Sequence, residues 1–215
     1  MRRLPITATL RRRAIPLLLA ALFLLPAGLA KAAPVAEAER FINALGMRTL
    51  DVLSRPGADD RQRVDELAGI LDQAADLQLI ARLVLGRHWR AANEQQRQEY
   101  VALFQAYARD SLAQRFGAYK GGQRFVIAGT KPVGDADALV STQIFLGRNQ
   151  APVAVDWRVR EVGGRLVIVD IVAEGISMLV TNRSEFDSIV NSRGIEGLLV
   201  QMRTWHSGTV PSRAA

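Results

Sequence analysis

The chain contains no cysteine and only two histidines, His88 and His206. Without cysteine there are no disulfides and no thiolate chemistry, so packing alone must hold the fold together. The two histidines form no pair at metal-ligand spacing, which predicts neither a metal site nor a cofactor. No serine lies in a G-x-S-x-G elbow, and no glycine-rich phosphate loop is present. We therefore expect no catalytic residue and a protein that is not an enzyme.

After residue 32 the sequence also lacks an apolar run that could span a bilayer, for which about 20 residues are needed. The first 32 residues differ from the rest. They hold five arginines by residue 13, a 12-residue apolar run over 14–25, and an A-x-A pattern that ends at Ala32. This is the layout of a secretory signal peptide. We expect export and cleavage after Ala32, which leaves a single domain over residues 33–215.

The net charge is close to zero once this leader is removed. The leader holds six of the 28 basic residues and none of the 21 acidic ones, so the net charge falls from +7 to +1, with 22 basic residues against 21 acidic. Nucleic acid is therefore not indicated as a partner. The 183 remaining residues are enough for one domain with a sizeable core, which we expect to be soluble and to end in a frayed tail over 207–215.

Helical spacing of apolar residues dominates the chain before residue 117. We expect a helix over 34–53, a second one capped by Asp59 or Asp60, a short one between Asp76 and Gly86, and a long one that starts with the capping box Asn93/Gln96 and runs to about Phe116. Two further helices are expected over 183–191 and 195–205, divided by Gly194.

Between these helical regions the period changes to two. Strands are expected over 124–130, 138–146, 152–160 and 165–173, and their short connections favour an antiparallel meander. The third strand alternates between Val153, Val155, Trp157 and Val159 on one face and Asp156, Arg158 and Arg160 on the other. The fourth strand has Val167, Val169 and Ile171 on one face and Leu166, Ile168 and Val172 on the other, which predicts a central strand covered on both sides. The order of elements predicts an α+β fold with a sheet of about four strands covered by several helices.

Two features leave alternatives open. Asp170 is an acid on an otherwise apolar strand, and a buried acid of this kind is a candidate general base. We favour a structural carboxylate bonded to backbone amides or an arginine, because buried acids also occur in structural networks. The apolar face of the third strand is either part of a solid core or the wall of a ligand cavity.

Several short blocks recur in a fixed order along the chain. DL at 76–77, IA at 80–81, VLG at 84–86, Trp89 and QR at 96–97 come first, followed by FGAY at 116–119 and VDWR at 155–158. VDIVAEGISM at 169–178, RSEF at 183–186 and GIEGLL at 194–199 complete the pattern. In this order and spacing the blocks resemble the MlaC family, also called toluene-tolerance auxiliary proteins. The chain departs from that family at Leu166, where a tryptophan is frequent, and at Asn182, where a tyrosine is frequent.

The resemblance implies a twisted antiparallel sheet with helices packed over it, enclosing an apolar lipid cavity. It implies a monomeric periplasmic carrier of diacyl phospholipid, with the acyl tails inside and the headgroup near solvent. Such a carrier would exchange lipid between an outer-membrane lipoprotein complex and the substrate-binding component of an inner-membrane ABC transporter, and so maintain the lipid asymmetry of the outer membrane. A related hopanoid-associated branch shares much of the pattern, so a hopanoid or another apolar ligand is an alternative.

From the apolar faces of the expected elements, we predict the residues that line this cavity. They are Leu77, Ile80, Leu83, Val84, Phe104, Phe125, Ile144, Val153, Val155, Trp157, Val169 and Ile171, with Met178 as an adaptable lip. A slip of one residue in a strand would invert every face. Two rival functions remain: a cavity-type enzyme that uses Asp170 as a base, and an adaptor with a filled interior that recruits other envelope proteins.

Overall fold

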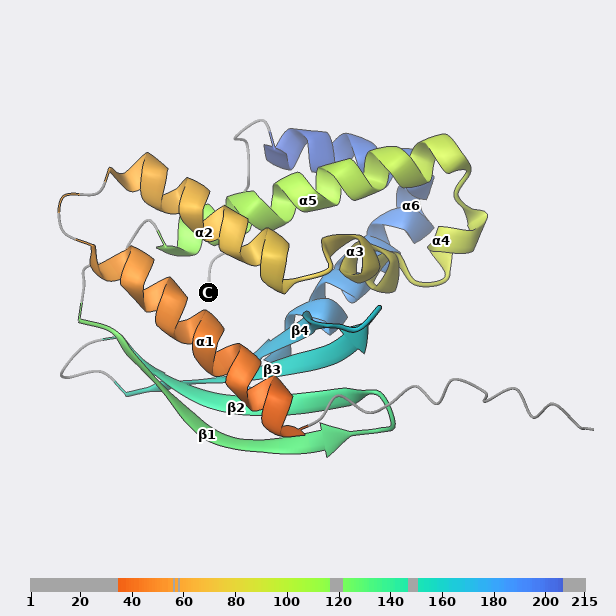
Figure 1. Cartoon of the computed structure of the whole chain (residues 1–215). Helices are drawn as coiled ribbons and strands as arrows, with labels where there is room; N and C mark the ends of the chain where they lie inside the picture. Colours follow the sequence, from red (N-terminus) through yellow and green to blue (C-terminus); the bar gives the residue numbers. More distant parts are fainter. Residues whose placement is uncertain (1–34, 56, 58, 117–121, 147–150, 207–215) are drawn as a thin grey trace, which may run out of the picture.

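The computed structural model describes residues 35–55, 57, 59–116, 122–146 and 151–206 (Figure 1). The expected leader and the expected C-terminal tail lie outside these residues. The described helices are α1 (Val35–Ser54), α2 (Asp60–Ala74), α3 (Leu77–Leu85), α4 (His88–Ala91), α5 (Glu94–Phe116) and α6 (Met178–His206). The described strands are β1 (Arg124–Val133), β2 (Asp137–Phe145), β3 (Val153–Val162), β4 (Arg165–Ala173) and β5 (Ile176–Ser177). The α+β class is confirmed.

The helix starts follow the predicted capping residues. Asp59 precedes α2 and accepts a hydrogen bond from the Arg61 backbone N–H. Asp76 precedes α3 and accepts from the Leu79 backbone N–H at 2.9 Å. Before α5 the capping box is complete, since the Asn93 and Gln96 side chains each accept from the other residue's backbone N–H at 2.9 Å. Each cap satisfies backbone donors that a helix start leaves without an intrahelical partner.

The strands form one antiparallel meander in the order β1-β2-β3-β4-β5, as predicted. The fifth strand was not predicted, because two residues are too few to show alternation. The predicted fourth strand, β4, does lie between two others, although its neighbour β5 pairs only with Val172 and Ala173. Val167, Ile168 and Val169 of β4 are nevertheless buried, as expected for a covered strand. Helices α2, α3 and α6 contact β4 and supply this cover.

The helices cover the sheet unevenly. Figure 1 shows α1 lying diagonally across the sheet, with α2, α5 and the end of α6 stacked above it. Helix α1 contacts β1 and β2, whereas α5 contacts α2, α3 and α6. Among the described helices, none is both long and apolar enough to cross a membrane.

The buried apolar residues of the described chain form three clusters, of which the smallest joins α1 to α2 and consists of Val52, Leu53, Leu67 and Ile70. The two larger clusters are named here as cores. We call the first the sheet core; it joins α1, the end of α2 and the start of α3 to strands β2–β4, and its buried members are Ala38, Ile42, Ala74, Ala75, Leu77, Ala138, Val140, Val159 and Ile168. We call the second the helical core; it lies between α3, α5 and α6, and its buried members are Ala81, Val84, Leu85, Tyr100, Phe104, Phe186, Leu198, Leu199 and Met202. Ile80 of α3 packs against both cores.

Helix α6 begins earlier than the sequence predicts and bends where predicted. Gly194 has φ 70° and ψ 178° inside the element, which divides it into two helical segments. This positive φ lies in the region that favours glycine. The first segment starts at Met178 because Ser177 caps it: the Ser177 hydroxyl oxygen accepts from the Val180 backbone N–H at 3.0 Å.

Candidate functional site

The face of the sheet that contributes to the sheet core is the candidate site, and we call it the inner face. Its side chains follow from the strand register, since directly paired residues point to the same side. Phe125, Ile144 and Val153 form one cross-strand row, and Val140, Trp157 and Ile171 form another. Thr142 and Val155 form the row between them.

Six of the predicted cavity residues lie together on this inner face. They are Phe125, Ile144, Val153, Val155, Trp157 and Ile171. Val155 is buried at 6% exposure, whereas the other five are only half-buried although the helices lie over this side. From α3, Leu77 and Ile80 pack into the same sheet core. The structure therefore brings eight of the thirteen predicted residues to one region; that they line a lipid cavity stays a prediction.

The other five predicted residues lie elsewhere. Val84 and Phe104 are members of the helical core, where Phe104 packs against Tyr100, Tyr107 and Phe186 with ring centroids 6.0–6.3 Å apart. Leu83, Val169 and Met178 belong to none of the three apolar clusters of the described residues. Helical spacing did not reveal this division, because it gives one apolar face for α5 but not the element that covers it.

The strand register explains why Val169 does not lie with the other predicted residues of the sheet. The register pairs Arg158 with Asp170 and Val159 with Ile168, which leaves Val169 as the extra residue of a bulge. A bulge shifts the alternation by one residue. Ile171 and Ile168 consequently share the inner face, and the prediction that Val167, Val169 and Ile171 point the same way was wrong.

The inner face contains one buried polar side chain, Thr142, which the sequence did not single out. Its hydroxyl donates to the Val155 carbonyl oxygen at 2.7 Å and accepts from the Trp157 indole N–H at 3.0 Å. Both polar groups are thus satisfied within the sheet, and a buried donor without a partner is avoided. This pair of bonds fixes the orientation of Trp157. Thr130, paired with Val140 on the same face, is likewise satisfied by a hydrogen bond to Glu39 at 2.7 Å.

Helix α1 approaches the edge strand closely at Gly46. A Cβ atom at this position would lie 2.8 Å from Cε1 of Phe125, well inside contact distance. Only glycine therefore lets the Phe125 ring sit against the backbone of α1 without displacement. The contact brings α1 directly against the edge strand β1.

The opposite face of the sheet, which we call the outer face, holds a buried carboxylate. Asp137 is 1% exposed and accepts hydrogen bonds from Arg158 Nε at 2.5 Å and from Arg160 Nε at 2.6 Å. Arg160 Nη2 adds a third bond at 3.0 Å. Burial acts to raise the pKa of Asp137, but the hydrogen bonds from Arg160 and Arg158 and their positive charges outweigh it and hold this pKa below its usual range. The sequence predicted that Arg158 and Arg160 point to the solvent-exposed face. It did not single out Asp137 as their partner, because Asp137 stands at the start of a strand.

We expect the replacement Asp137→Asn to destabilise the protein by about 2 kcal/mol at pH 7, the size of lost hydrogen bonds to charged groups. Because the pKa of Asp137 is lowered by folding, its contribution is present above the unfolded pKa of about 4 and is lost as pH falls through the folded value. The difference between wild type and Asp137→Asn in urea unfolding should shrink as the pH drops below about 4. An unchanged difference down to acid pH would contradict this assignment; Asp65→Asn, on the exposed side of α2, is the control.

Asp170 has a structural role in the described chain. Its carboxylate accepts from the backbone N–H groups of Ile171 at 2.8 Å and Leu179 at 3.0 Å, and from the Ser177 hydroxyl at 2.6 Å. Both oxygens are occupied, and the residue is 8% exposed. These bonds tie β4 to the start of α6, which confirms the interpretation of Asp170 as a carboxylate bonded to backbone amides.

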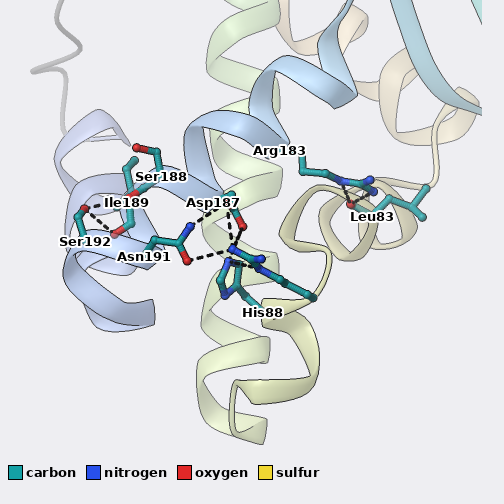
Figure 2. A network of polar contacts seen from close by, with 9 residues as sticks. Leu83, His88, Arg183, Asp187, Ser188, Ile189, Asn191 and Ser192 are labelled. Atoms are coloured by element: carbon teal, nitrogen blue, oxygen red, sulfur yellow. Dashed lines mark hydrogen bonds and ion pairs between the residues drawn. The ribbon is translucent and has the colours of Figure 1, made fainter.

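A polar network links α4 to α6 (Figure 2). His88 Nε2 lies 2.8 Å from Asp187 Oδ1, and the Asn191 side chain donates to Asp187 Oδ2 at 2.8 Å. The hydrogen bond with His88, helped by the charge of Arg87, holds the pKa of Asp187 below its usual range. Nearby, the Arg183 guanidinium donates to the Leu83 carbonyl oxygen at the end of α3. The network holds α4 against α6. In the parts of the chain that the structure describes, no cluster of three or more His, Asp or Glu residues is arranged to hold a metal.

Comparison with known proteins gives consistent matches. The family model described as MlaC protein matches residues 44–204. The intermembrane phospholipid transport system binding protein MlaC of Haemophilus influenzae is 25% identical over 131 residues, which are 60% of this chain and 61% of that protein. The match thus spans less than two thirds of that relative's length. The phospholipid-binding protein of Ralstonia solanacearum, solved in complex with a phospholipid, has a TM-score of 0.69 at 21% identity, with 79% of this chain and 97% of that chain covered. This last likeness shows a shared fold.

Proposed function

Since the chain belongs to the MlaC family, we propose that it carries a diacyl phospholipid through the periplasm with the acyl tails held between the inner face and the helices over it. The observation that carries this proposal is the inner face itself. Six apolar residues from four strands share it, and five of them are only half-buried beneath a covering layer. The names of the two relatives, one a phospholipid transport binding protein and one solved with a phospholipid, support the same ligand.

The energetics explain why a carrier is needed. Two acyl chains hold on the order of 30 methylenes, and at roughly 0.8 kcal/mol each their exposure to water costs more than about 20 kcal/mol. Unaided passage across an aqueous gap is therefore negligible. A carrier must offer comparable apolar surface without unpaired polar groups. The inner face fits this requirement, because its buried polar side chain, Thr142, is satisfied by Val155 and Trp157.

The proposal includes export and partners. The leader over 1–32 would direct the chain to the periplasm and be removed, and the domain would act there as a monomer. It would exchange lipid with an outer-membrane lipoprotein complex and with the substrate-binding component of an inner-membrane ABC transporter. Release would need the docked partner to help open the space between α1 and the inner face, so that tails move from one apolar site to another. No step of this exchange requires a catalytic residue.

Native mass spectrometry of the mature protein, purified without detergent, tests the proposal. We expect a mass increment that matches a diacyl phospholipid, lost when the same sample is measured under denaturing conditions. Lipid extraction and fragmentation would identify the headgroup and would separate a phospholipid from a hopanoid. Consistent recovery of the bare polypeptide from several preparations would favour an adaptor with a filled interior and would count against the carrier.

A further inference from the structure

The outer face of the sheet presents cations in a fixed arrangement. Lys131 of β1 and Arg158 of β3 lie in one cross-strand row on either side of Leu139, and Arg160 lies in the next row beside Asp137. Neighbouring strands are about 4.8 Å apart, so Lys131 and Arg158 start roughly 10 Å from each other. Their side chains are long enough to reach a common ligand above Leu139.

The two arginines are held by one carboxylate. Asp137 binds Arg158 through Nε and Arg160 through both Nε and Nη2, and all three bonds use the inner edges of the guanidinium groups. The side chains of Arg158 and Arg160 remain 40% and 30% exposed. Two hydrogen bonds set the orientation of the Arg160 guanidinium and one anchors Arg158, while part of each side chain remains exposed to solvent.

The two arginines carry more positive charge and more hydrogen-bond donors than Asp137 can pair with. One carboxylate neutralises one of the two guanidinium groups, and the structure gives no acceptor, within the described residues, to either Nη nitrogen of Arg158 or to Nη1 of Arg160. Two other acids share this face. Asp170 lies opposite Arg158 on β4 but bonds to Ile171, Ser177 and Leu179, and Asp156 lies one row further along β3. Within the described residues, neither acid accepts a hydrogen bond from the two arginines, so the remaining N–H groups of Arg158 and Arg160 stay available.

From this geometry we infer that Arg158 and Arg160, oriented by Asp137 and assisted by Lys131, form a phosphate-binding site on the outer face of the sheet. Guanidinium groups with free, coplanar N–H donors bind phosphate oxygens in pairs, and preorientation reduces the entropy lost on binding. The ligand class is a phosphate monoester or diester, whether in the headgroup of a membrane phospholipid or as a free phosphate. The site lies on the side of the sheet opposite the inner face, so it is separate from the acyl-binding region.

Two measurements on the mature protein test this site and distinguish the two sources of phosphate. In the first, inorganic phosphate is added while the arginine Nε–Hε resonances are followed by NMR, with chloride at equal ionic strength as the reference. In the second, the protein is sedimented with vesicles of phosphatidylcholine alone or mixed with phosphatidylglycerol. We expect phosphate to shift the resonances of Arg158 and Arg160 selectively.

The variant for both measurements is Arg158→Gln, which removes two outward nitrogens while Arg160 keeps Asp137 paired. The control is Arg61→Gln, an equal charge change on the exposed side of α2. We expect Arg158→Gln to weaken phosphate binding about tenfold, the effect of losing charge-assisted hydrogen bonds, and Arg61→Gln to leave it unchanged.

Each outcome decides the inference. Selective phosphate shifts together with vesicle binding that Arg158→Gln abolishes identify a lipid headgroup as the source. Selective shifts without vesicle binding keep the site and assign it to a free phosphate. No selective shift, or equal losses in Arg158→Gln and Arg61→Gln, overturns the inference and leaves the two arginines as counterions of Asp137. The phosphate titration does not depend on bound acyl chains, so its result is independent of the carrier proposal.

Discussion

The replacement Val155→Asp is expected to lower the fraction of lipid-bound protein at least tenfold. Val155 lies in the middle row of the inner face and is 6% exposed. A carboxylate there would be buried against acyl chains without a charged partner, and an unpaired buried charge is strongly unfavourable. Water or protonation would be needed to accommodate it, and the surface offered to the tails would no longer be apolar. Native mass spectrometry and lipid extraction measure the occupancy directly.

A matched replacement separates this effect from a general loss of stability. Val126 lies on the outer face of β1 and is 43% exposed, so Val126→Asp introduces the same group where water can solvate it. We expect normal lipid content in that variant. Should Val155→Asp fail to fold by circular dichroism, the neutral and bulky Val155→Phe tests the same position by filling space. Full lipid content in folded Val155→Phe and Val155→Asp would show that acyl chains do not contact this face.

The second large effect is expected from Phe186→Ala in the helical core. Phe186 is fully buried, and its ring centroid lies 6.2 Å from that of Tyr100 and 6.0 Å from that of Trp205. Removing a buried aromatic ring costs about 3–5 kcal/mol, from lost burial and from the cavity left behind. Urea unfolding should show this loss in the free energy of unfolding. Lipid occupancy of the molecules that remain folded should be unchanged, because Phe186 does not belong to the sheet core.

Val180→Ala on the same helix is the control for this prediction. Val180 is 60% exposed, so its truncation should change stability by less than about 0.5 kcal/mol. If folded Phe186→Ala lost as much bound lipid as Val155→Asp does, lipid binding would depend on the helical core as well as on the inner face, contrary to this prediction. That result would also restore Phe104, a neighbour of Phe186, as a candidate for contact with the ligand.

Local signals predicted much of this fold. Asp59, Asp76 and the Asn93/Gln96 pair lie where the helices begin, because capping depends on residues a few positions apart. Strict alternation in β3 placed Val153, Val155 and Trp157 together, and the register confirms their common face. The family blocks predicted the MlaC family correctly, and a match over residues 44–204 establishes it.

What the sequence did not reveal depends on contacts between distant residues. The bulge that displaces Val169 arises from the pairing of β3 with β4, and nothing in the residues of β4 alone marks it. The division of apolar helices between two cores is equally non-local, so Phe104 and Val84 were grouped with the sheet. Asp137 looked like an ordinary residue after a turn; its burial depends on Arg158 and Arg160, more than 20 positions later.

The distinction between the sheet core and the helical core has a consequence for ligand binding. Helix α1 meets the sheet through the sheet core, whereas α5 and the second part of α6 pack mainly in the helical core, with Ala108 of α5 also packed against the sheet core. Ile80 of α3 packs against both cores, and α2 contacts both α1 and α5, so the two cores are linked at more than one place. If acyl tails occupy the inner face, they would rearrange the packing of the sheet core, while the contacts inside the helical core could stay as they are.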